Sequence, residues 1–548
     1  MSKPRKLSAV PRRIVLPAAA VLVAALFLAV AGASAHTDST AAPAAKASKS
    51  ASTTLTWALG TNPASLFGPY YFSTSGAAMM SLVYQTGLAY GTYGQLQPQV
   101  ISSWKQTSPT RYVYTVKPGQ KFSDGTPVTA KDVAFSLAIN VDPKIGSRFA
   151  ALFVSVKRIT ASGNQVIVTL KQPDSTWRYV PAQMAGYVFS KASYQKNPNA
   201  YGTPTALPVG SGPYKYQSFQ PNSQVVLVRN PHWTGKKYPW DKIVMPIIPN
   251  AQALLLALQN GTVDGTFDVP SSSLSQWIPA QGIVLHTFPS AGWRGFSIDM
   301  TDGPFADLNV RKAIAYSIDK AGLVKALLYG AGQPLKCIVP PSMFKSVLPA
   351  KEVDSALAKI PGYDYDLSKA KAALKASKYP NGFTTTLNVP DGCGACMAIS
   401  QNLQQSLAQI GITVKLNVMP GAPRFQVILD HDAHLGLQVL GMGPDNPDPA
   451  NYPSILWPSD QAVKGGQNSS NWRTSAVDTL MKQSLASANR AAAARLILKG
   501  CALEAQQVSY IPIFTFPYAV AVKKGLNVTS GIGPFYSTVN WLQYLRVG

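Results

Sequence analysis

The four cysteines are the residues whose spacing points most directly to chemistry. Cys393 and Cys396 are separated by two residues, follow the strand-like run FTTTLNV and precede a helix predicted at 398–409. Because a dithiol at the start of a helix has a lowered pKa and exchanges readily, one hypothesis is a thiol-disulfide enzyme that uses this pair. In an exported protein the ordinary expectation is that all four form disulfides, and with Cys337 and Cys501 three pairings are open.

The same cysteines are not expected to share a metal ion with the two histidines of the segment HDAH. His431 follows Cys396 after 34 intervening residues, whereas a zinc finger uses about 12–15. Cys393 is expected at the carboxyl end of its strand and His434 at the start of a parallel neighbour. At ~3.3 Å per residue the two would lie about 20 Å apart, too far to bind one ion.

No familiar catalytic motif occurs in the sequence: there is no GxSxG elbow, HExxH helix, Walker loop or GxGxxG turn after a strand. Asp445 and Asp448 share the loop GMGPDNPDPANY, but their spacing gives no opposed geometry across a glycosidic bond. This loop follows the apolar run LGLQVL, so its carboxylates are expected at the carboxyl end of a strand, where open α/β sheets place ligands. The absence of these motifs agrees with a binding protein, for which no cofactor is expected.

Strand-like and helical segments alternate along the chain. Runs such as VIVTL and VVLVR alternate with helical patterns, which we predict at 131–139, 251–260, 309–328, 367–376, 398–409 and 475–507. This alternation predicts an α/β protein with mixed sheets. A chain of 548 residues is too long for one core and should form two or three domains.

Residues 112–136, YVYTVKPGQKFSDGTPVTAKDVAFS, carry the most specific pattern. A β-branched and aromatic run ends at a Pro-Gly turn, and an Asp-Gly turn follows. Thr129 then stands three residues before Asp132, as the N-cap of a helix. Each feature is common in globular proteins, but this order of features is not.

This segment resembles the signature of the family 5 extracellular solute-binding proteins, the receptors of oligopeptide, dipeptide and nickel ABC importers. Further motifs match in the family's order, from about residue 55 to the C-terminus. They are VGSGPYKYQSF, LVRNPHWTGKKYP, ALQNGTVDG, DLNVRKAIAYSIDKAGLVKALLYGAGQP, YDLSKAKAALKASKYPNGF and GMGPDNPDPANY. One departure is SLFGP at 65–69, where relatives read S-L-D-P, so a contact made by that aspartate is missing.

The resemblance implies a two-lobed α/β fold like that of periplasmic binding proteins (type II, cluster C), with three domains, mixed sheets and a hinge. Domain I would be discontinuous and form lobe 1 from residues 55–82, 210–286 and 521–548. Domain II, residues 83–209, would extend lobe 1. Domain III, residues 287–520, would form lobe 2.

The resemblance also implies one ligand contact. In peptide-binding relatives an aspartate in the block that matches GMGPDNPDPANY pairs with the ligand's α-ammonium group, and that position here is Asp445. A carboxylate kept charged in a closing cleft has its desolvation offset only by a cation, so it selects for ammonium. The alternative is a turn-forming aspartate that bonds to local backbone N–H groups.

Four other residues are candidates for the cavity. Trp293 and Arg294 lie in SAGWRGFSIDM, where relatives cross between lobes, and Arg294 could bind a ligand carboxylate with two hydrogen bonds. Tyr71 and Trp457 are candidate wall residues. For both tryptophans and Tyr71, burial in the core is the competing interpretation.

The N-terminus indicates export. Residues 1–35 combine a basic start, an apolar stretch and the small-residue end AGASA, which predicts a signal cleaved after Ala35 or retained as an anchor. Residues 36–54 are rich in Ala, Ser, Thr and Lys and predict a disordered tether. The first cysteine is Cys337, so a cysteine-linked lipid anchor is not expected. We expect the protein outside the cytoplasm, in the periplasm or at the cell surface.

The chain is strongly basic, with 49 Lys and Arg against 24 Asp and Glu and a net charge of +25. These basic residues are scattered singly, without a basic arm or interleaved stacking residues, so no nucleic-acid partner is expected.

The predicted function is that of an extracytoplasmic, monomeric substrate-binding protein of an ABC importer. It would close two lobes around a peptide or similar small solute and present it to a membrane ABC permease. A nickel or metal-chelate receptor of the same family is the first alternative. The second is the thiol-disulfide enzyme that would use Cys393 and Cys396.

Overall fold

The computed structural model of the chain describes residues 53–70, 73–91, 94–270, 273–431, 435–529, 532–533 and 535–548. The predicted signal and nearly all of the predicted tether therefore lie outside the described residues. Within the described part, no helix combines the length and the apolar character that a membrane span requires.

A mixed sheet of eleven strands forms the centre of the fold. Its order is β10-β11-β12-β1-β13-β19-β14-β18-β16-β17, and β15 pairs with β19. The strands are β1 (Thr54–Ala58), β10 (Tyr214–Gln220), β11 (Gln224–Arg229), β12 (Lys242–Pro246), β13 (Gly265–Thr266), β14 (Ile283–Ile298), β15 (Gln333–Pro334), β16 (Thr384–Pro390), β17 (Thr413–Met419), β18 (Leu437–Met442) and β19 (Tyr510–Lys523). Strands and helices alternate, which confirms the predicted α/β class.

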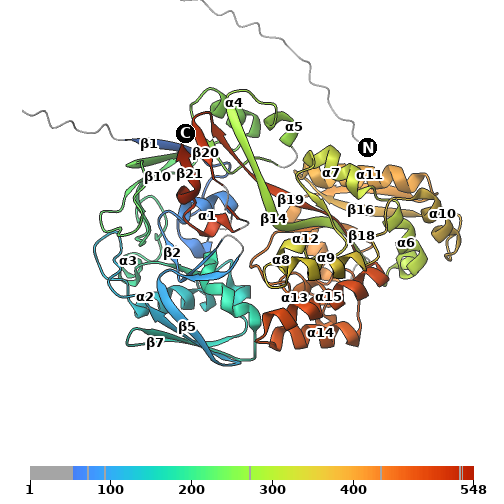
Figure 1. The fold of residues 1–548 in the computed structure, drawn as a ribbon, viewed down its shortest axis with the longest axis horizontal. Helices are drawn as coiled ribbons and strands as arrows, with labels where there is room; N and C mark the ends of the chain where they lie inside the picture. Colours follow the sequence, from blue (N-terminus) through green and yellow to red (C-terminus); the bar gives the residue numbers. More distant parts are fainter. Residues whose placement is uncertain are drawn as a thin grey trace, which may run out of the picture. The chain divides into compact units, whose positions relative to one another are not determined.

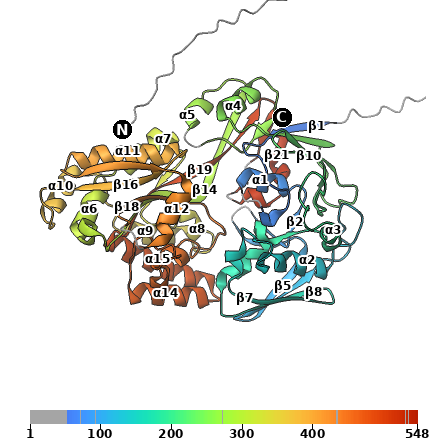
Figure 2. The same ribbon diagram turned by 180° about the vertical axis from the view of Figure 1, so that it is seen from behind.

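The long strands β14 and β19 connect the two halves of this sheet (Figures 1 and 2). They pair antiparallel from Ile283↔Lys523 to Ser297↔Tyr510. Their register shifts in the middle, after Pro289↔Pro517, and such an irregularity bends a strand. The crossing strands therefore provide the hinge that the resemblance implied.

A second, antiparallel sheet has the order β5-β6-β8-β7. Its strands are β5 (Ile101–Ser108), β6 (Arg111–Val116), β7 (Val156–Ser162) and β8 (Gln165–Leu170), and α2 (Ala130–Ala138) packs against it. The predicted cap of α2 is confirmed, because Thr129 and Asp132 form a reciprocal capping box.

Two of the predicted helices are each divided into two. The segment predicted at 309–328 forms α6 (Leu308–Tyr316) and α7 (Lys320–Leu328), because the Asp319 side chain accepts a hydrogen bond from the Gly322 N–H and starts a new helix. Asn489 likewise caps α15 (Arg490–Gln507) and separates it from α14 (Ser475–Ala486). The other predicted helices are found as α4 (Ala251–Gln259), α10 (Leu367–Lys375) and α11 (Gly394–Ala408).

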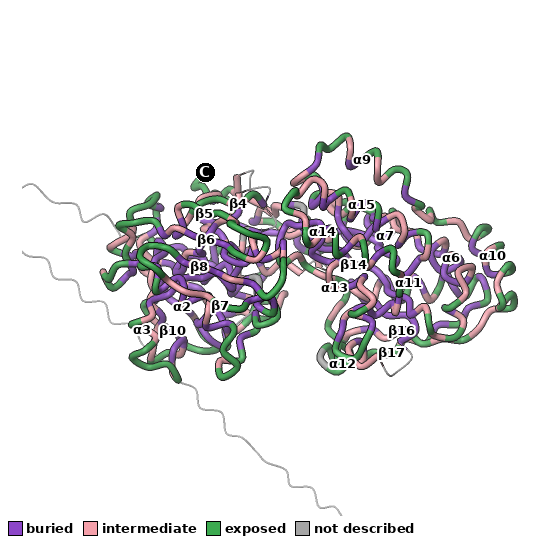
Figure 3. The backbone as a smooth tube through the Cα atoms, turned by 90° about the horizontal axis from the view of Figure 1, so that it is seen from below, coloured by how far each residue is buried: buried purple, intermediate pink, exposed green. Residues whose placement is uncertain are grey.

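Buried apolar side chains form separate clusters rather than one core, and the buried segments gather in two groups in Figure 3. Lobe 1 contains the clusters drawn from residues 55–288 and 520–545. Lobe 2 contains the clusters drawn from residues 291–514. The fold is thus two-lobed, while the three domain boundaries given above stay predictions.

Two disulfides settle the pairing that the sequence left open. Cys337 is bonded to Cys501, with 5.4 Å between their Cα atoms, inside a buried cluster of lobe 2. Cys393 is bonded to Cys396, at the start of α11.

Candidate ligand-binding site

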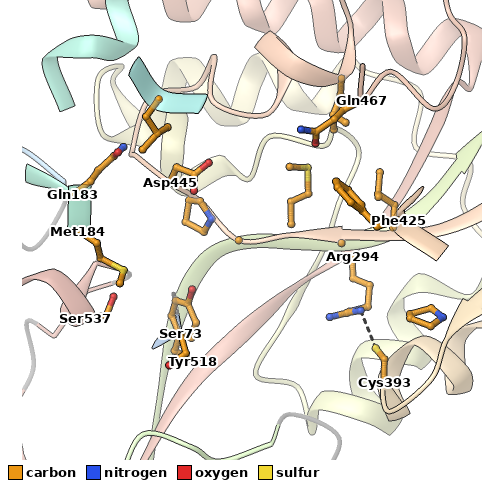
Figure 4. Close-up of a pocket in the computed structure, with 18 of the residues that line it drawn as sticks. Ser73, Gln183, Met184, Arg294, Cys393, Phe425, Asp445, Gln467, Tyr518 and Ser537 are labelled. Atoms are coloured by element: carbon orange, nitrogen blue, oxygen red, sulfur yellow. Dashed lines mark hydrogen bonds between the residues drawn. The ribbon is translucent and has the colours of Figure 1, made fainter. Parts of the chain in front are cut away.

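A cavity of about 580 Å³ is lined by residues of both lobes (Figure 4). Lobe 1 contributes Gln183 and Ser537, lobe 2 contributes Phe425 and Gln467, and the crossing strand β19 contributes Tyr518. This is the location in which hinge closure would enclose a ligand.

The lobe 2 wall lies at the carboxyl ends of three parallel strands. β16 pairs in parallel with both β17 and β18. β16 is followed by α11, β17 by α12 (Gly421–Asp430), and β18 by the loop that carries Asp445. All three connections contribute lining residues, as expected for ligand sites of open α/β sheets.

Asp445 lies at the cavity, with its side chain open to the interior (Figure 4). The backbone N–H of Asp445 donates a hydrogen bond to the side-chain oxygen of Asn451 at 3.3 Å. Protein surrounds the carboxyl group on its other sides, and this desolvation raises the pKa of Asp445, partly offset by a hydrogen bond with Asn451. No cation among the described residues forms an ion pair with it.

Asp448, in the same loop, has a structural role. It is buried, and its Oδ1 atom accepts a hydrogen bond from the Ala450 N–H at 3.0 Å. This is the turn-forming bond of an aspartate, so the two carboxylates of the loop differ in environment.

Arg294 also lines the cavity, away from Asp445 (Figure 4). Its Nη1 atom lies 3.2 Å from Cys393 Sγ and contacts the Cys396 sulfur, and its guanidinium lies 5.6 Å from the Phe516 ring centre. Burial lowers the pKa of Arg294. The disulfide therefore belongs to the cavity wall and holds the arginine in place.

Arg424, in the first turns of α12, was not predicted from the sequence. It is buried, donates a hydrogen bond from Nε to the Asn388 carbonyl at 3.3 Å and another from Nη2 to the Val439 carbonyl, and lines the cavity. Burial, together with the nearby charge of Arg294, lowers the pKa of Arg424 to about 10. The sequence could have indicated this residue only through its position, because α12 follows β17 and ligand sites lie where parallel strands end.

The two predicted tryptophans are not at the cavity. Trp293 is fully buried in lobe 2, with its ring edge-on to Tyr452 and Tyr510. Trp457 is 1% exposed and packs on Trp472. Both tryptophans are therefore core residues, as the alternative interpretation of the sequence held. Tyr71 lies outside the described residues.

The remaining wall is largely apolar. Phe425 is 46% exposed, and it shares the wall with Phe149, Ile428 and Phe535. The aromatic Tyr90 stacks at a tilt on Phe535, with 4.6 Å between ring centres. Such a surface can accept varied side chains of a ligand without specific hydrogen bonds.

Metal ligands do not gather in the described part of the chain, where no group of three or more His, Cys, Asp and Glu could hold an ion. The His431 ring bonds to Asn471 and to the Gly466 carbonyl, and His434 lies outside the described residues.

Two lobes joined by crossing strands, with a cavity between them, define the class of periplasmic-binding-protein-like receptors. Residues 95–463 match the profile of the bacterial extracellular solute-binding proteins, family 5 Middle. Because this match covers more than half of the chain, the chain belongs to the family 5 bacterial extracellular solute-binding proteins.

Characterised relatives agree with this assignment. The chain is 27% identical over 453 residues to the probable D,D-dipeptide-binding periplasmic protein DdpA of Escherichia coli (strain K12), covering 80% of this chain and 84% of that protein. It is 30% identical over 318 residues to the glutathione-binding protein GsiB of the same strain, covering 57% of this chain and 59% of that protein.

Solved structures show the same fold. The periplasmic binding protein DppA from Helicobacter pylori, in complex with the peptide STSA, superposes with a TM-score of 0.72 at 24% identity and covers 90% of this chain and 98% of its own. HbpA2 from Haemophilus parasuis gives a TM-score of 0.77 at 21% identity, covering 90% of this chain and 100% of its own.

Members of this family are transport receptors and not enzymes, so the chain is a substrate-binding receptor that acts outside the cytoplasm. The hypothesis of a thiol-disulfide enzyme is therefore wrong. Its motif, Cys393 and Cys396, forms a disulfide at the wall of the cavity.

Proposed function

We propose that the receptor binds peptides in its interlobe cavity, with the amino end at Asp445, and delivers them to a membrane ABC permease. The observation that most supports this is the separation of unlike charges at one cavity. Asp445 lies on one side and Arg294 on another (Figure 4). Arg424, which also lines the cavity, is hydrogen-bonded to β16, the strand that precedes the disulfide in contact with Arg294. A peptide carries an ammonium group at one end and a carboxylate at the other, so it would pair with both.

The relatives support the same ligand class. DdpA is named a probable D,D-dipeptide-binding protein, and the H. pylori structure contains a peptide. The volume of about 580 Å³ falls in the range of small-molecule sites, about 300–1,000 Å³. Bridging waters would let the cavity hold the main chain of a peptide while tolerating different side chains.

Closure would couple binding to transport. A ligand held by Asp445 in one loop and by lobe 1 residues such as Gln183 contacts both lobes only in the closed form. Its differential affinity for that form would shift the hinge equilibrium, and the permease would recognise the closed receptor.

Calorimetry with short unmodified peptides tests this function. Asp445→Asn should lower peptide affinity by about tenfold or more, because the amide keeps the shape of the carboxylate but loses the charge that pairs with ammonium. Asp460→Asn, at an exposed position outside the cavity, should change nothing. Equal affinities of the wild type and Asp445→Asn would remove Asp445 from the site.

We also propose that residues 1–35 direct export, that residues 36–54 tether the folded part, and that the receptor is a monomer without a cysteine-linked lipid. The intact mass of the exported protein distinguishes cleavage after Ala35 from a retained anchor, and light scattering gives the oligomeric state.

A further inference from the structure

The charged residues that line the cavity do not balance the charges of an ordinary peptide. Among the described lining residues three are charged: Arg294, Arg424 and Asp445. Tyr90 and Tyr518 also line the cavity, but burial raises the pKa of both, that of Tyr518 to about 12, so both are neutral at pH 7. The described lining residues therefore present one net positive charge to the ligand.

Among the described residues, neither guanidinium has an anion as partner. Arg424 donates to the backbone carbonyls of Asn388 and Val439. Arg294 contacts the sulfurs of the disulfide and the face of Phe516. No carboxylate of the described chain forms an ion pair with either arginine, so the charge of both remains available to a ligand.

The two arginines act on the same part of the cavity. Arg424 donates to carbonyls of β16 and β18, while Arg294 lies on β14, which pairs with β18, and contacts the disulfide that follows β16. In agreement with this placement, the charge of Arg294 lowers the pKa of Arg424. The first turns of α11 and α12 contribute Cys396 and Phe425 to the same wall, and the positive ends of these helix dipoles add to the potential there. Two positive charges held close together without a counter-ion repel each other in the empty protein, and a ligand anion would offset this repulsion.

We infer that the end of the ligand bound at Arg294 and Arg424 carries two negative charges, so that the preferred substrates are peptides whose last residue is Asp or Glu. Such a peptide has one ammonium and two carboxylates, and its net charge of −1 complements the cavity. This inference rests on the proposed function, since it places the amino end of the peptide at Asp445. A peptide with a neutral last residue would leave one buried guanidinium unpaired.

Matched peptides test the inference on the unmodified protein. Alanine di-, tri- and tetrapeptides that end in Glu are compared by calorimetry with the same peptides that end in Gln, which differ by one charge and hardly in shape. The peptides ending in Glu should bind about tenfold more tightly or better.

A variant then assigns the preference to the second arginine. In Arg424→Met the preference for Glu over Gln should fall below about threefold, while Arg424→Lys, which keeps the charge, should retain most of it. Thermal melting shows whether each variant is folded, and the wild-type comparison remains decisive if one is not.

The outcomes separate the two proposals. Equal affinity of wild type for Glu and Gln peptides would overturn the inference and leave the proposed function intact. A Glu preference that persists in folded Arg424→Met would also overturn it. If no peptide of either series binds, the proposed function fails, and the inference fails with it.

Discussion

The guanidinium of Arg490 lies over the ring of Tyr179, with 5.2 Å between its Cζ atom and the ring centre. Tyr179 belongs to η4 (Ser175–Ala182) of lobe 1, and Arg490 begins α15 of lobe 2. The Nε atom of Arg490 also lies 4.0 Å from Asp448, in the loop that carries Asp445. This contact therefore joins the two lobes beside the ligand site.

Arg490→Ala should weaken peptide binding although Arg490 does not line the cavity. A cation–π contact between lobes is worth about 0.5–2 kcal/mol, and its loss disfavours the closed form that binds peptide. Calorimetry should show affinity lower by about two- to thirtyfold. Arg495→Ala is the matched control, because Arg495 lies in the same helix but pairs with Glu352 inside lobe 2. Equal effects of the two substitutions would argue against an interlobe role.

Gly94→Ala should impede closure. Gly94 has φ +81°, and a Cβ atom there would lie 2.5 Å from Cβ of Pro447, in the opposite lobe. Gly119→Ala is the control, since Gly119 has φ +78° and no described atom within 4 Å of such a Cβ. Both substitutions should cost about 1 kcal/mol of stability through backbone strain, but Gly94→Ala alone should weaken peptide binding. Equal peptide affinities of the two variants in calorimetry would contradict this.

Peptide affinity should fall as the pH is lowered and Asp445 becomes protonated. The fall should begin at a higher pH than it would if this carboxylate had the pKa of a fully solvated aspartate. Burial raises the pKa of Asp445, and the protonated carboxyl cannot pair with ammonium. Calorimetry across acidic pH should show this loss, and Asp445→Asn should remove this part of the pH dependence.

The contribution of Asp445 to the stability of the empty protein should change with pH in the opposite direction to peptide affinity. A carboxyl whose pKa is raised on folding binds protons more tightly in the folded state, so its contribution to the free energy of unfolding falls as pH rises through that range. In thermal melts without ligand, Asp445→Asn should therefore gain stability relative to wild type at neutral pH more than at acidic pH. A constant difference at all pH values would argue against a raised pKa.

The two disulfides should differ in their effect on stability. The Cys337–Cys501 bond closes a loop of 164 residues, whereas Cys393–Cys396 closes one of 3. From chain entropy the long loop is worth about 5 kcal/mol and the short one about 2. Cys337→Ala with Cys501→Ala should thus lower the melting temperature more than Cys393→Ala with Cys396→Ala. The reverse order would mean that packing at α11 outweighs loop closure.

Local signals in the sequence predicted the fold well. The cap at Thr129, the alternation of strands and helices, and the loop after β18 are all set by near neighbours in the chain. The breaks before α7 and α15 were missed, because the helical spacing of apolar residues in the sequence continues past Asp319 and Asn489. In the structure these two side chains cap new helices and so end the preceding ones.

The site was predicted less completely, because its residues meet only in the folded chain. For Arg424 the sequence offers only its place in a helix that follows a parallel strand, because its role depends on carbonyls of two strands that are distant in sequence. Trp293 sits next to Arg294, but alternation along β14 turns its ring into the core. The disulfide pairing likewise depended on which segments the fold brings together.

Identification of the bound solute tests the central claim most directly. The exported receptor would be purified from rich medium without denaturation, and the solutes released on unfolding would be identified by mass spectrometry. We predict peptides with free amino termini, in smaller amounts in Asp445→Asn purified in parallel. Release of a metal chelate, or of a solute without an ammonium group, would contradict the account.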